Sequence, residues 1–267
     1  MAPSAGSTPT RPGMPAPNSI LSSRDFAPRA LGQTTAAATH ELRGRYRILR
    51  TDEVDAKDEA LSHVQLKNVM ATGTAVATRA TGDDFAGTAR AAAKLSIASA
   101  RTEEFPDVKD LIASLPPKNK MVHHNPKITT EEDSERVQEE ERNVRVTAFL
   151  YAASRENDND FHLIVGRDPA SDTPMYMTME ISGLPPSNDA SFATLKAARD
   201  AYKGFFGNDL PGASYDFYDP PIKINVEGSL FFDMSHATGR SPGPPSLHDD
   251  MPVIWEVHPI SKIVFEP

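Results

Sequence analysis

The sequence contains no cysteine and no long apolar run. The absence of cysteine from its 267 residues excludes a disulfide framework, a zinc–thiolate site and a cysteine nucleophile. No apolar segment approaches the roughly 18 residues that a membrane-spanning helix needs. Residues 1–32 also lack the charged region and continuous apolar stretch of a secretory signal. We therefore expect a soluble, cytoplasmic protein that does not associate with membranes.

Several catalytic sequence motifs are absent as well. There is no G-x-S-x-G turn, no G-x-x-x-x-G-K-S/T loop and no G-x-G-x-x-G turn after a strand. The chain also lacks an H-E-x-x-H helix and an H-x-E…P-C-x-x-C pattern. These absences argue against nucleophilic-serine α/β hydrolases, nucleotide-binding folds of the common types and zinc enzymes with a familiar ligand spacing.

Negative charge predominates, but it is unevenly distributed over a formal net charge of −9. Residues 1–50 carry seven arginines against two acids, whereas residues 143–267 carry 9 basic and 17 acidic side chains. Residues 1–40 are rich in Ala, Pro, Ser, Thr and Gly, with Phe26 as their only aromatic residue. Such a composition predicts a flexible arm. Its arginines make it a candidate contact for a polyanion or a protein partner; the oligomeric state stays open.

The region between the arm and Asn143 has weaker patterns. Residues 41–120 predict a small mixed α/β segment, and residues 121–142 predict an acidic linker that is exposed to solvent. The candidate strands and helices in the mixed segment are Arg45–Leu49, Val64–Met70, Thr74–Thr78, Phe85–Ala100 and Val108–Leu115.

Residues 143–267 predict a β-rich domain, because apolar and polar residues alternate there. The predicted strands cover residues 143–153, 160–166, 175–182, 220–233 and 252–265, and one predicted helix covers residues 187–206. Three strands, a helix and two strands form the element order of a five-stranded Greek-key barrel of the oligonucleotide/oligosaccharide-binding (OB) type. A generic α+β sheet gives a similar pattern. The predicted fold class is therefore α+β, mainly β, with an OB-like barrel.

Histidines and acidic residues recur on these predicted strands. They occur in NDFHL, MEISG, FFDMSH and WEVHP, as Asp160, His162, Glu180, Asp233, His236, Glu256 and His258. Residues i and i+2 of a strand share a face, so Asp160 lies beside His162 and Glu256 beside His258. If the strands close into a barrel, the pairs could converge at one rim. Imidazole and carboxylate groups suit divalent metals and acid–base catalysis, but the same groups also serve as internal hydrogen-bond struts.

The same segments resemble a family of uncharacterised bacterial proteins with an OB-like C-terminal domain. The resemblance is carried by the NDFHL strand, the MEISGLP strand end, the GSLFFDMSH strand and the closing WEVHP. It covers residues 143–267 and implies a domain and a site rather than a reaction. It favours the acid–histidine positions over the other polar residues of the domain.

Two functions follow as hypotheses. The first is a metal-dependent hydrolase of phosphodiesters or esters that uses Zn²⁺, Mn²⁺ or Mg²⁺. Its predicted metal ligands are Asp160, His162, His236 and His258, and its predicted catalytic residues are Glu180, Asp233 and Glu256. The second is a non-catalytic OB-type binding or assembly module whose N-terminal arm becomes ordered on a partner.

Overall fold

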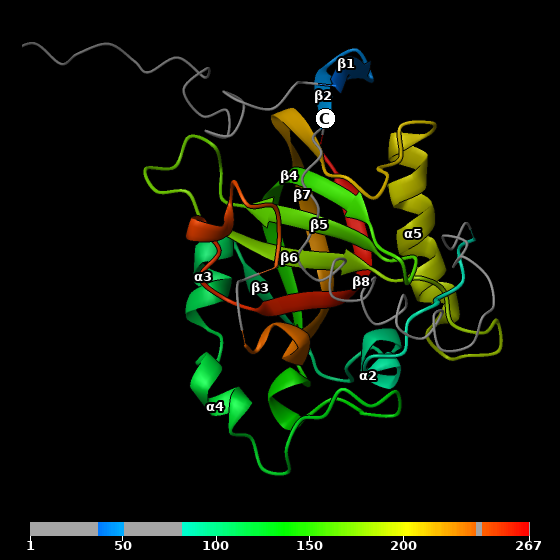
Figure 1. Cartoon of the computed structure of the whole chain (residues 1–267), viewed down its shortest axis with the longest axis vertical. Coiled ribbons are helices and arrows are strands. Elements are labelled where there is room, and N and C mark those ends of the chain that lie inside the picture. Colours follow the sequence, from blue (N-terminus) through cyan, green and yellow to red (C-terminus); the bar gives the residue numbers. More distant parts are fainter. Residues whose placement is uncertain (1–36, 51–81, 239–241, 267) are drawn as a thin grey trace, which may run out of the picture.

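The computed structural model describes residues 37–50, 82–238 and 242–266. Within these ranges the strands form one mixed eight-stranded sheet in the order β1-β2-β7-β8-β6-β5-β4-β3 (Figure 1). Its strands are β1 (Ala37–Leu42), β2 (Tyr46–Arg50), β3 (Thr102–Phe105), β4 (Asn143–Arg155), β5 (Phe161–Gly166), β6 (Tyr176–Ile181), β7 (Asp216–Phe232) and β8 (Trp255–Phe265). The protein is therefore mainly β, and the alternating patterns after Asn143 correctly predict β4 to β8.

Five of the described strands form a closed ring of pairings. β4 pairs with β5, β5 with β6, β6 with β8, β8 with β7, and β7 pairs again with β4. Every pairing in the ring is antiparallel except the parallel one between β6 and β8. The long strand β7 shifts its register against β8 at Gly228, where a Cβ atom would collide with the carbonyl of Pro259. Glycine at this position therefore permits the close approach of β8.

The two faces of β5 and β6 differ in chemistry, although both are buried. Phe161, Leu163 and Met179 face the main hydrophobic core. Because successive side chains of a strand point to opposite faces, His162 and Glu180 lie on the other face. Every residue of both strands is buried. The face of β5 and β6 that carries His162 and Glu180 is therefore polar and is covered by other segments of the chain.

Helix α5 (Phe192–Phe206) packs along β8, on the opposite side of the strands from α3 in Figure 1. Its buried face includes Leu195 and Tyr202, and it ends at Gly207, which has a φ of 59°. The predicted helix and its end at Phe206 are confirmed. The predicted start is wrong, because the N-cap is Ser191 and its backbone N–H and hydroxyl donate to Asp189.

Shorter helices cover the ends of the ring. They are α2 (Ala91–Leu95), α3 (Val108–Ala113) and α4 (Lys118–Val122), with 3₁₀ turns η2 (Gln138–Glu140), η3 (Met234–His236) and η4 (His248–Asp250). The prediction of a helix over Phe85–Ala100 is wrong outside α2. Arg90 has a left-handed φ of 52° and Ser96 is extended, so the helical hydrogen bonds cannot continue in either direction.

The acidic segment before Asn143 is not a purely solvated linker. Glu140 is fully buried, and both of its oxygens accept hydrogen bonds from the guanidinium of Arg90. The side chain of Arg136 donates to the carbonyl of His258 and to that of Ala93. This segment is therefore attached to α2 and to the ring.

Some predictions concern residues outside the described ranges. Residues 1–36 of the predicted flexible arm and the candidate strands Val64–Met70 and Thr74–Thr78 fall there. The last four residues of the predicted arm, 37–40, lie within the described part of the chain and belong to β1. Among the described residues, no helix is long and apolar enough to span a membrane.

Candidate metal centre

The ring strands bring distant polar residues together through their register. His162 on β5 is paired directly with Glu180 on β6. Thr178 on β6 is paired with Glu256 on the parallel strand β8, and His258 follows two residues later on the same face. Side chains that face each other across neighbouring strands lie within contact distance. The sheet therefore assembles the site from three strands.

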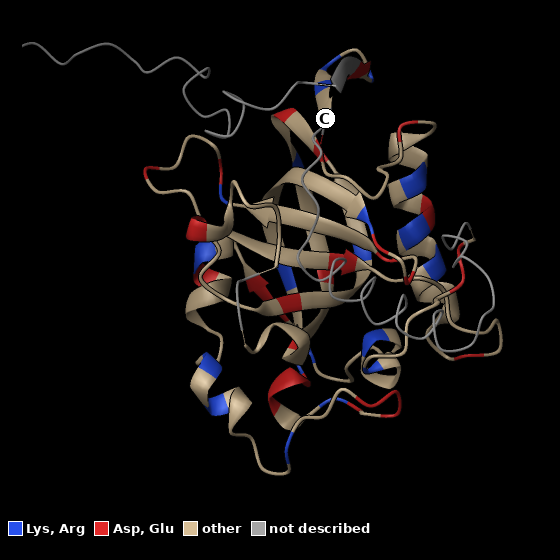
Figure 2. Ribbon diagram, in the orientation of Figure 1, with Lys and Arg blue, Asp and Glu red and all other residues tan. Residues whose placement is uncertain are grey.

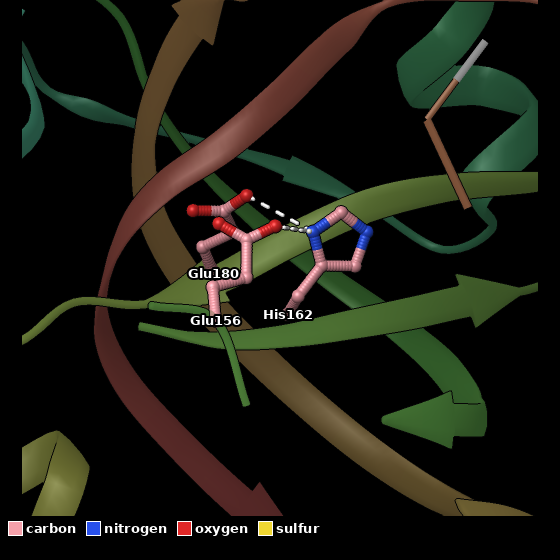
Figure 3. Close-up of side chains that lie close together, drawn as sticks. All are labelled: Glu156, His162 and Glu180. Carbon is pink, nitrogen blue, oxygen red and sulfur yellow. Dashed lines mark hydrogen bonds and ion pairs between the residues drawn. The ribbon is translucent and has the colours of Figure 1, made fainter. Parts of the chain in front are cut away.

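Glu180 lies between two histidines. Its Oε1 is 3.2 Å from His162 Nδ1, and its Oε2 is 2.9 Å from His258 Nδ1. Glu156 approaches the same nitrogen of His162, with its Oε1 at 2.9 Å, and Figure 3 shows both carboxylates directed at this ring atom. Glu180 thus uses one oxygen for each imidazole.

Asp160 extends the group beyond His258. Its Oδ2 is 3.4 Å from His258 Nε2 and 3.7 Å from Lys94 Nζ, while its Oδ1 accepts a hydrogen bond of 2.6 Å from the backbone of Gly183. Lys94, on α2, also forms an ion pair of 3.2 Å with Asp158. The eight residues of this group, here called the Glu180 cluster, are Lys94, Glu156, Asp158, Asp160, His162, Glu180, Glu256 and His258.

The cluster is shielded from solvent. The side chains of His162, Glu180 and His258 are 0 % exposed. Aromatic rings cover the imidazoles: Tyr215 lies edge-on to His162, with ring centroids 6.1 Å apart, and the Phe231 ring centroid is 5.4 Å from that of His258. In Figure 2 acidic residues appear on strands in the middle of the molecule as well as on the outer loops.

Carboxyl groups outnumber basic side chains among the named members of the cluster. It contains five carboxyl groups, one lysine and two histidines. Burial, and next the charge of Asp158, raise the pKa of Asp160 well above its usual range. Burial alone would lower the pKa of His258, but the carboxylates of Glu180 and Glu256 outweigh it and raise the pKa to about 9. Both shifts favour protonated side chains within the cluster.

Two overlapping sets of side chains could bind a metal ion. They are Glu156, His162 and Glu180, and Asp160, Glu180 and His258, and the ligand atoms of each set lie within 4.8 Å of one another. Imidazole and carboxylate ligands suit Zn²⁺ and Mn²⁺ better than Mg²⁺, which favours oxygen. The buried hydroxyl of Thr178, on the same face of β6, has no hydrogen-bond partner among the described residues. The donor set therefore fits a divalent cation.

The structure brings five of the predicted site residues together and places the other two elsewhere. Asp160, His162, Glu180, Glu256 and His258 all belong to the Glu180 cluster. Asp233 and His236 belong to neither ligand set; they pair with one another, and Asp233 also accepts a 2.8 Å hydrogen bond from the backbone of Ser235 at the start of η3. A single site formed by three histidines is therefore not the grouping observed, and the assigned roles stay predictions.

Three members of the cluster were not predicted. Glu156 and Asp158 lie in the ENDND segment, a turn between β4 and β5 that contains Asn159 with a φ of 74°. A signal was present, because Glu156, Asp158, Asp160 and His162 occupy alternate positions that continue the spacing of β5. Lys94 lies in an alanine-rich stretch, and nothing in its local pattern indicates a partner 64 residues away.

A surface cleft lies against helix α2. That cleft has a volume of about 580 Å³ and includes Ala91, Ala92 and Leu95 of α2 in its lining. Lys94 of the same helix contacts the cluster instead. Helix α2 therefore separates the cleft from the buried ligands.

Comparisons with known proteins do not assign the site. No family model, no curated protein and no solved structure matches this chain. The geometry of the described residues is therefore the only basis for a functional proposal.

Proposed function

We propose that the Glu180 cluster is a divalent metal centre and that the chain is a metal-dependent hydrolase of phosphodiesters or esters. The observation that carries the proposal is the pair of buried histidine–carboxylate sets that share Glu180. Burial of several carboxylates in one place destabilises the folded state unless cations or protons neutralise their charge. A bound cation would provide that neutralisation and a reactive centre together.

The fold supports a related proposal, that the ring is an OB-type barrel. The first three ring strands pair in sequence, the fifth pairs with the third and the fourth, and the fourth pairs with the first. The helix α5 lies in the chain between the third and fourth ring strands. This arrangement agrees with a five-stranded Greek-key barrel, a fold whose members bind oligonucleotides and oligosaccharides.

The residues divide naturally between ligands and proton carriers. One of the two sets, either Glu156, His162 and Glu180 or Asp160, Glu180 and His258, would hold the cation, which would supply Lewis-acid activation of a water molecule. In the hydrolysis the water oxygen forms a bond to phosphorus or to the acyl carbon, the bond to the leaving oxygen breaks, and the leaving oxygen takes up the proton that the water loses. Glu256, whose Oε2 is 3.6 Å from His258 Nδ1, would be the carboxyl group that transfers this proton.

Access is the main requirement of this proposal. Because the ligands are buried, a substrate must displace a covering segment before it reaches them. Helix α2 is the candidate, since it separates the cleft of about 580 Å³ from the cluster. A neutral or small anionic ester fits an acidic domain better than a long polyanion does, unless the metal reverses the local charge.

The direct test combines metal analysis with activity. Purified protein is analysed for bound metal, and phosphodiester and ester substrates are assayed before and after chelation. We expect stoichiometric metal, chelator-sensitive turnover, and loss of both in Glu180→Gln. His124→Asn is the matched control, because His124 forms a histidine–carboxylate pair with Glu139 outside the cluster. Absence of metal, or turnover that survives chelation, would contradict the proposal.

The complete burial of the cluster favours a second function, a non-catalytic binding or assembly module. Its buried acids and histidines would then serve as internal struts, and partners would bind elsewhere on the ring. In that case the stability of the metal-free protein equals that of the metal-loaded protein, and light scattering would give a higher oligomeric state for the full-length protein than for residues 41–267. Monomers of both would argue against assembly through the arm.

A further inference from the structure

The two ligand sets that share Glu180 differ in the state of their imidazole. In the first set, His162 Nδ1 forms a hydrogen bond of 2.9 Å with Glu156 Oε1. An ionised carboxylate only accepts hydrogen bonds, so this bond assigns the proton of the imidazole to Nδ1. A ring nitrogen that carries a proton has no lone pair for a metal ion. His162 therefore presents an N–H, and not a ligand atom, to Glu156.

The second ring nitrogen of His162 points away from the acids of this set. Figure 3 shows Nδ1 facing both Glu156 and Glu180, with the other nitrogen on the far side of the ring. Glu180 Oε1 lies 3.2 Å from Nδ1. The nitrogen that faces the two carboxylates is thus the one that carries the proton. Glu156, His162 and Glu180 form a continuous line of polar contacts that needs no ion.

The second set contains donor atoms without hydrogen bonds. Asp160 Oδ2 and both ring nitrogens of His258 are buried and form no hydrogen bond within the described residues. Asp160 Oδ2 and His258 Nε2 face each other at 3.4 Å. The ammonium of Lys94 lies 3.7 Å from the same oxygen, but its hydrogen bond of 3.2 Å goes to Asp158. Since buried polar atoms rarely lack a hydrogen bond, a cation would complete this side of the cluster.

Glu180 connects the two sides. Its Oε1 lies 3.2 Å from His162 Nδ1, and its Oε2 lies 2.9 Å from His258 Nδ1. The N–H of His162 attracts Oε1, which fixes the rotation of the carboxylate and keeps Oε2 beside His258. Groups that orient a ligand from outside in this way typically change metal affinity by about 10–100-fold when they are removed.

We propose that Asp160, Glu180 and His258 bind the cation, and that His162, hydrogen-bonded to Glu156, is a positioning residue that holds Glu180 and does not touch the ion. The inference rests on the proposed metal centre and specifies which of its two ligand sets is occupied. One imidazole and two carboxylates suit Mn²⁺ or Zn²⁺, and three protein ligands leave a coordination position open for water or substrate.

The test makes the same substitution at the two histidines of the full-length, chelator-stripped protein. Bound Mn²⁺ is counted by elemental analysis, and electron spin echo envelope modulation detects the nitrogen of an imidazole that binds the ion. We expect modulation from one imidazole in the unmodified protein. His162→Asn should keep this modulation, because the asparagine amide offers an N–H near the place of Nδ1. His258→Asn should abolish the modulation.

Removal of the N–H tests the positioning role. His162→Leu should raise the Kd for Mn²⁺ by about 10–100-fold and still show the modulation, because the ligands themselves are unchanged. His162→Asn should recover most of the lost affinity. Equal affinities of these two variants would mean that the N–H does not hold Glu180, and would overturn the positioning role.

A second pair of variants keeps the test decisive if a histidine variant does not fold. Glu156→Gln should retain the ion and the modulation, whereas Asp160→Asn should lose most of the binding. Circular dichroism of each metal-free variant reports whether it is folded. His124→Asn is the control, since His124 pairs with Glu139 outside the cluster, and it should match the unmodified protein.

The outcomes separate this inference from the proposed hydrolysis. Loss of the modulation in His162→Asn, its persistence in His258→Asn, or modulation from two imidazoles in the unmodified protein would each overturn the ligand assignment and leave the metal centre in place. Manganese bound through His258 without chelator-sensitive turnover would support the assignment and contradict the hydrolase. Absence of bound manganese would overturn both.

Discussion

The Arg90–Glu140 ion pair and the Glu180 cluster are both buried, yet they are built in opposite ways. Arg90 and Glu140 have matched charges and meet through two hydrogen bonds of 2.7 and 2.8 Å. The same carboxylate also accepts from the backbone of Phe232 and of Val137, and the guanidinium lies 4.7 Å from the ring centroid of Phe231. Each oxygen of Glu140 therefore accepts two hydrogen bonds, and the pair balances its own charge. Among its named members, the Glu180 cluster has five carboxyl groups and three basic side chains.

The difference indicates how a structural ion pair can be told from a ligand site. A saturated, balanced pair has no capacity for a further ion, and removing one partner leaves a charge buried without compensation. A cluster with excess carboxylates gains stability when a cation enters. Mutations should therefore have opposite effects in the two regions.

Breaking the balanced pair should have the largest effect. Arg90→Met leaves Glu140 buried without its partner, so we expect the free energy of unfolding to fall by about 3–5 kcal/mol. Unfolding in denaturant measures this free energy. Arg101→Met, at an exposed arginine, is the control and should change stability by less than about 0.5 kcal/mol. Equal effects of the two substitutions would mean that the buried pair is not structural.

Adding metal should stabilise the protein by a somewhat smaller amount. At a free Mn²⁺ concentration of about 100 times Kd, binding to the native state adds about 2.7 kcal/mol. Thermal unfolding with and without chelator measures the change in Tm, and calcium serves as a control cation that prefers oxygen ligands. An unchanged Tm would place the cluster in the same structural class as the Arg90–Glu140 pair.

Asp160→Asn should separate metal binding from stability. Burial raises the pKa of Asp160 and so favours its protonated form, which asparagine resembles in shape and charge. We expect the chelated variant to unfold within about 1 kcal/mol of the unmodified protein and to lose much of the metal-induced increase in Tm. A large loss of stability under chelation would show that the carboxylate is needed as a structural strut.

The smallest effect concerns Asp83, a partly exposed residue that forms ion pairs with Arg199 and Lys203 of α5. Burial tends to raise the pKa of Asp83, but hydrogen bonds from Lys203 and Arg199 prevail and lower it. A lowered carboxyl pKa adds stability that is complete above the unfolded-state value of about 3.9 and is lost as the pH falls through the folded-state value. Asp83→Asn should therefore lower stability slightly at pH 7 and less at pH 3. Equal losses at both pH values would exclude the charge as the cause.

Local sequence patterns predict the strands and part of the site. Val144, Val146, Ala148 and Leu150 alternate with polar residues and correctly indicate β4, and the D-x-H and E-x-H spacings correctly indicate a shared face. The parallel pairing of β6 with β8 depends on contacts between residues far apart in the chain, which no local pattern records. The same reason explains why Lys94 and the Arg90–Glu140 pair were missed. Asp233 and His236 show the opposite case. Their spacing also suggests a site, but in the structure these two residues pair with each other at η3.

The most direct measurement is anomalous X-ray diffraction from crystals soaked in Mn²⁺. We expect strong anomalous density within at least one of the two ligand sets that share Glu180, absent from crystals soaked with chelator. Density only at surface acids, or none within the cluster at saturating Mn²⁺, would contradict the central claim that this buried group is a metal centre.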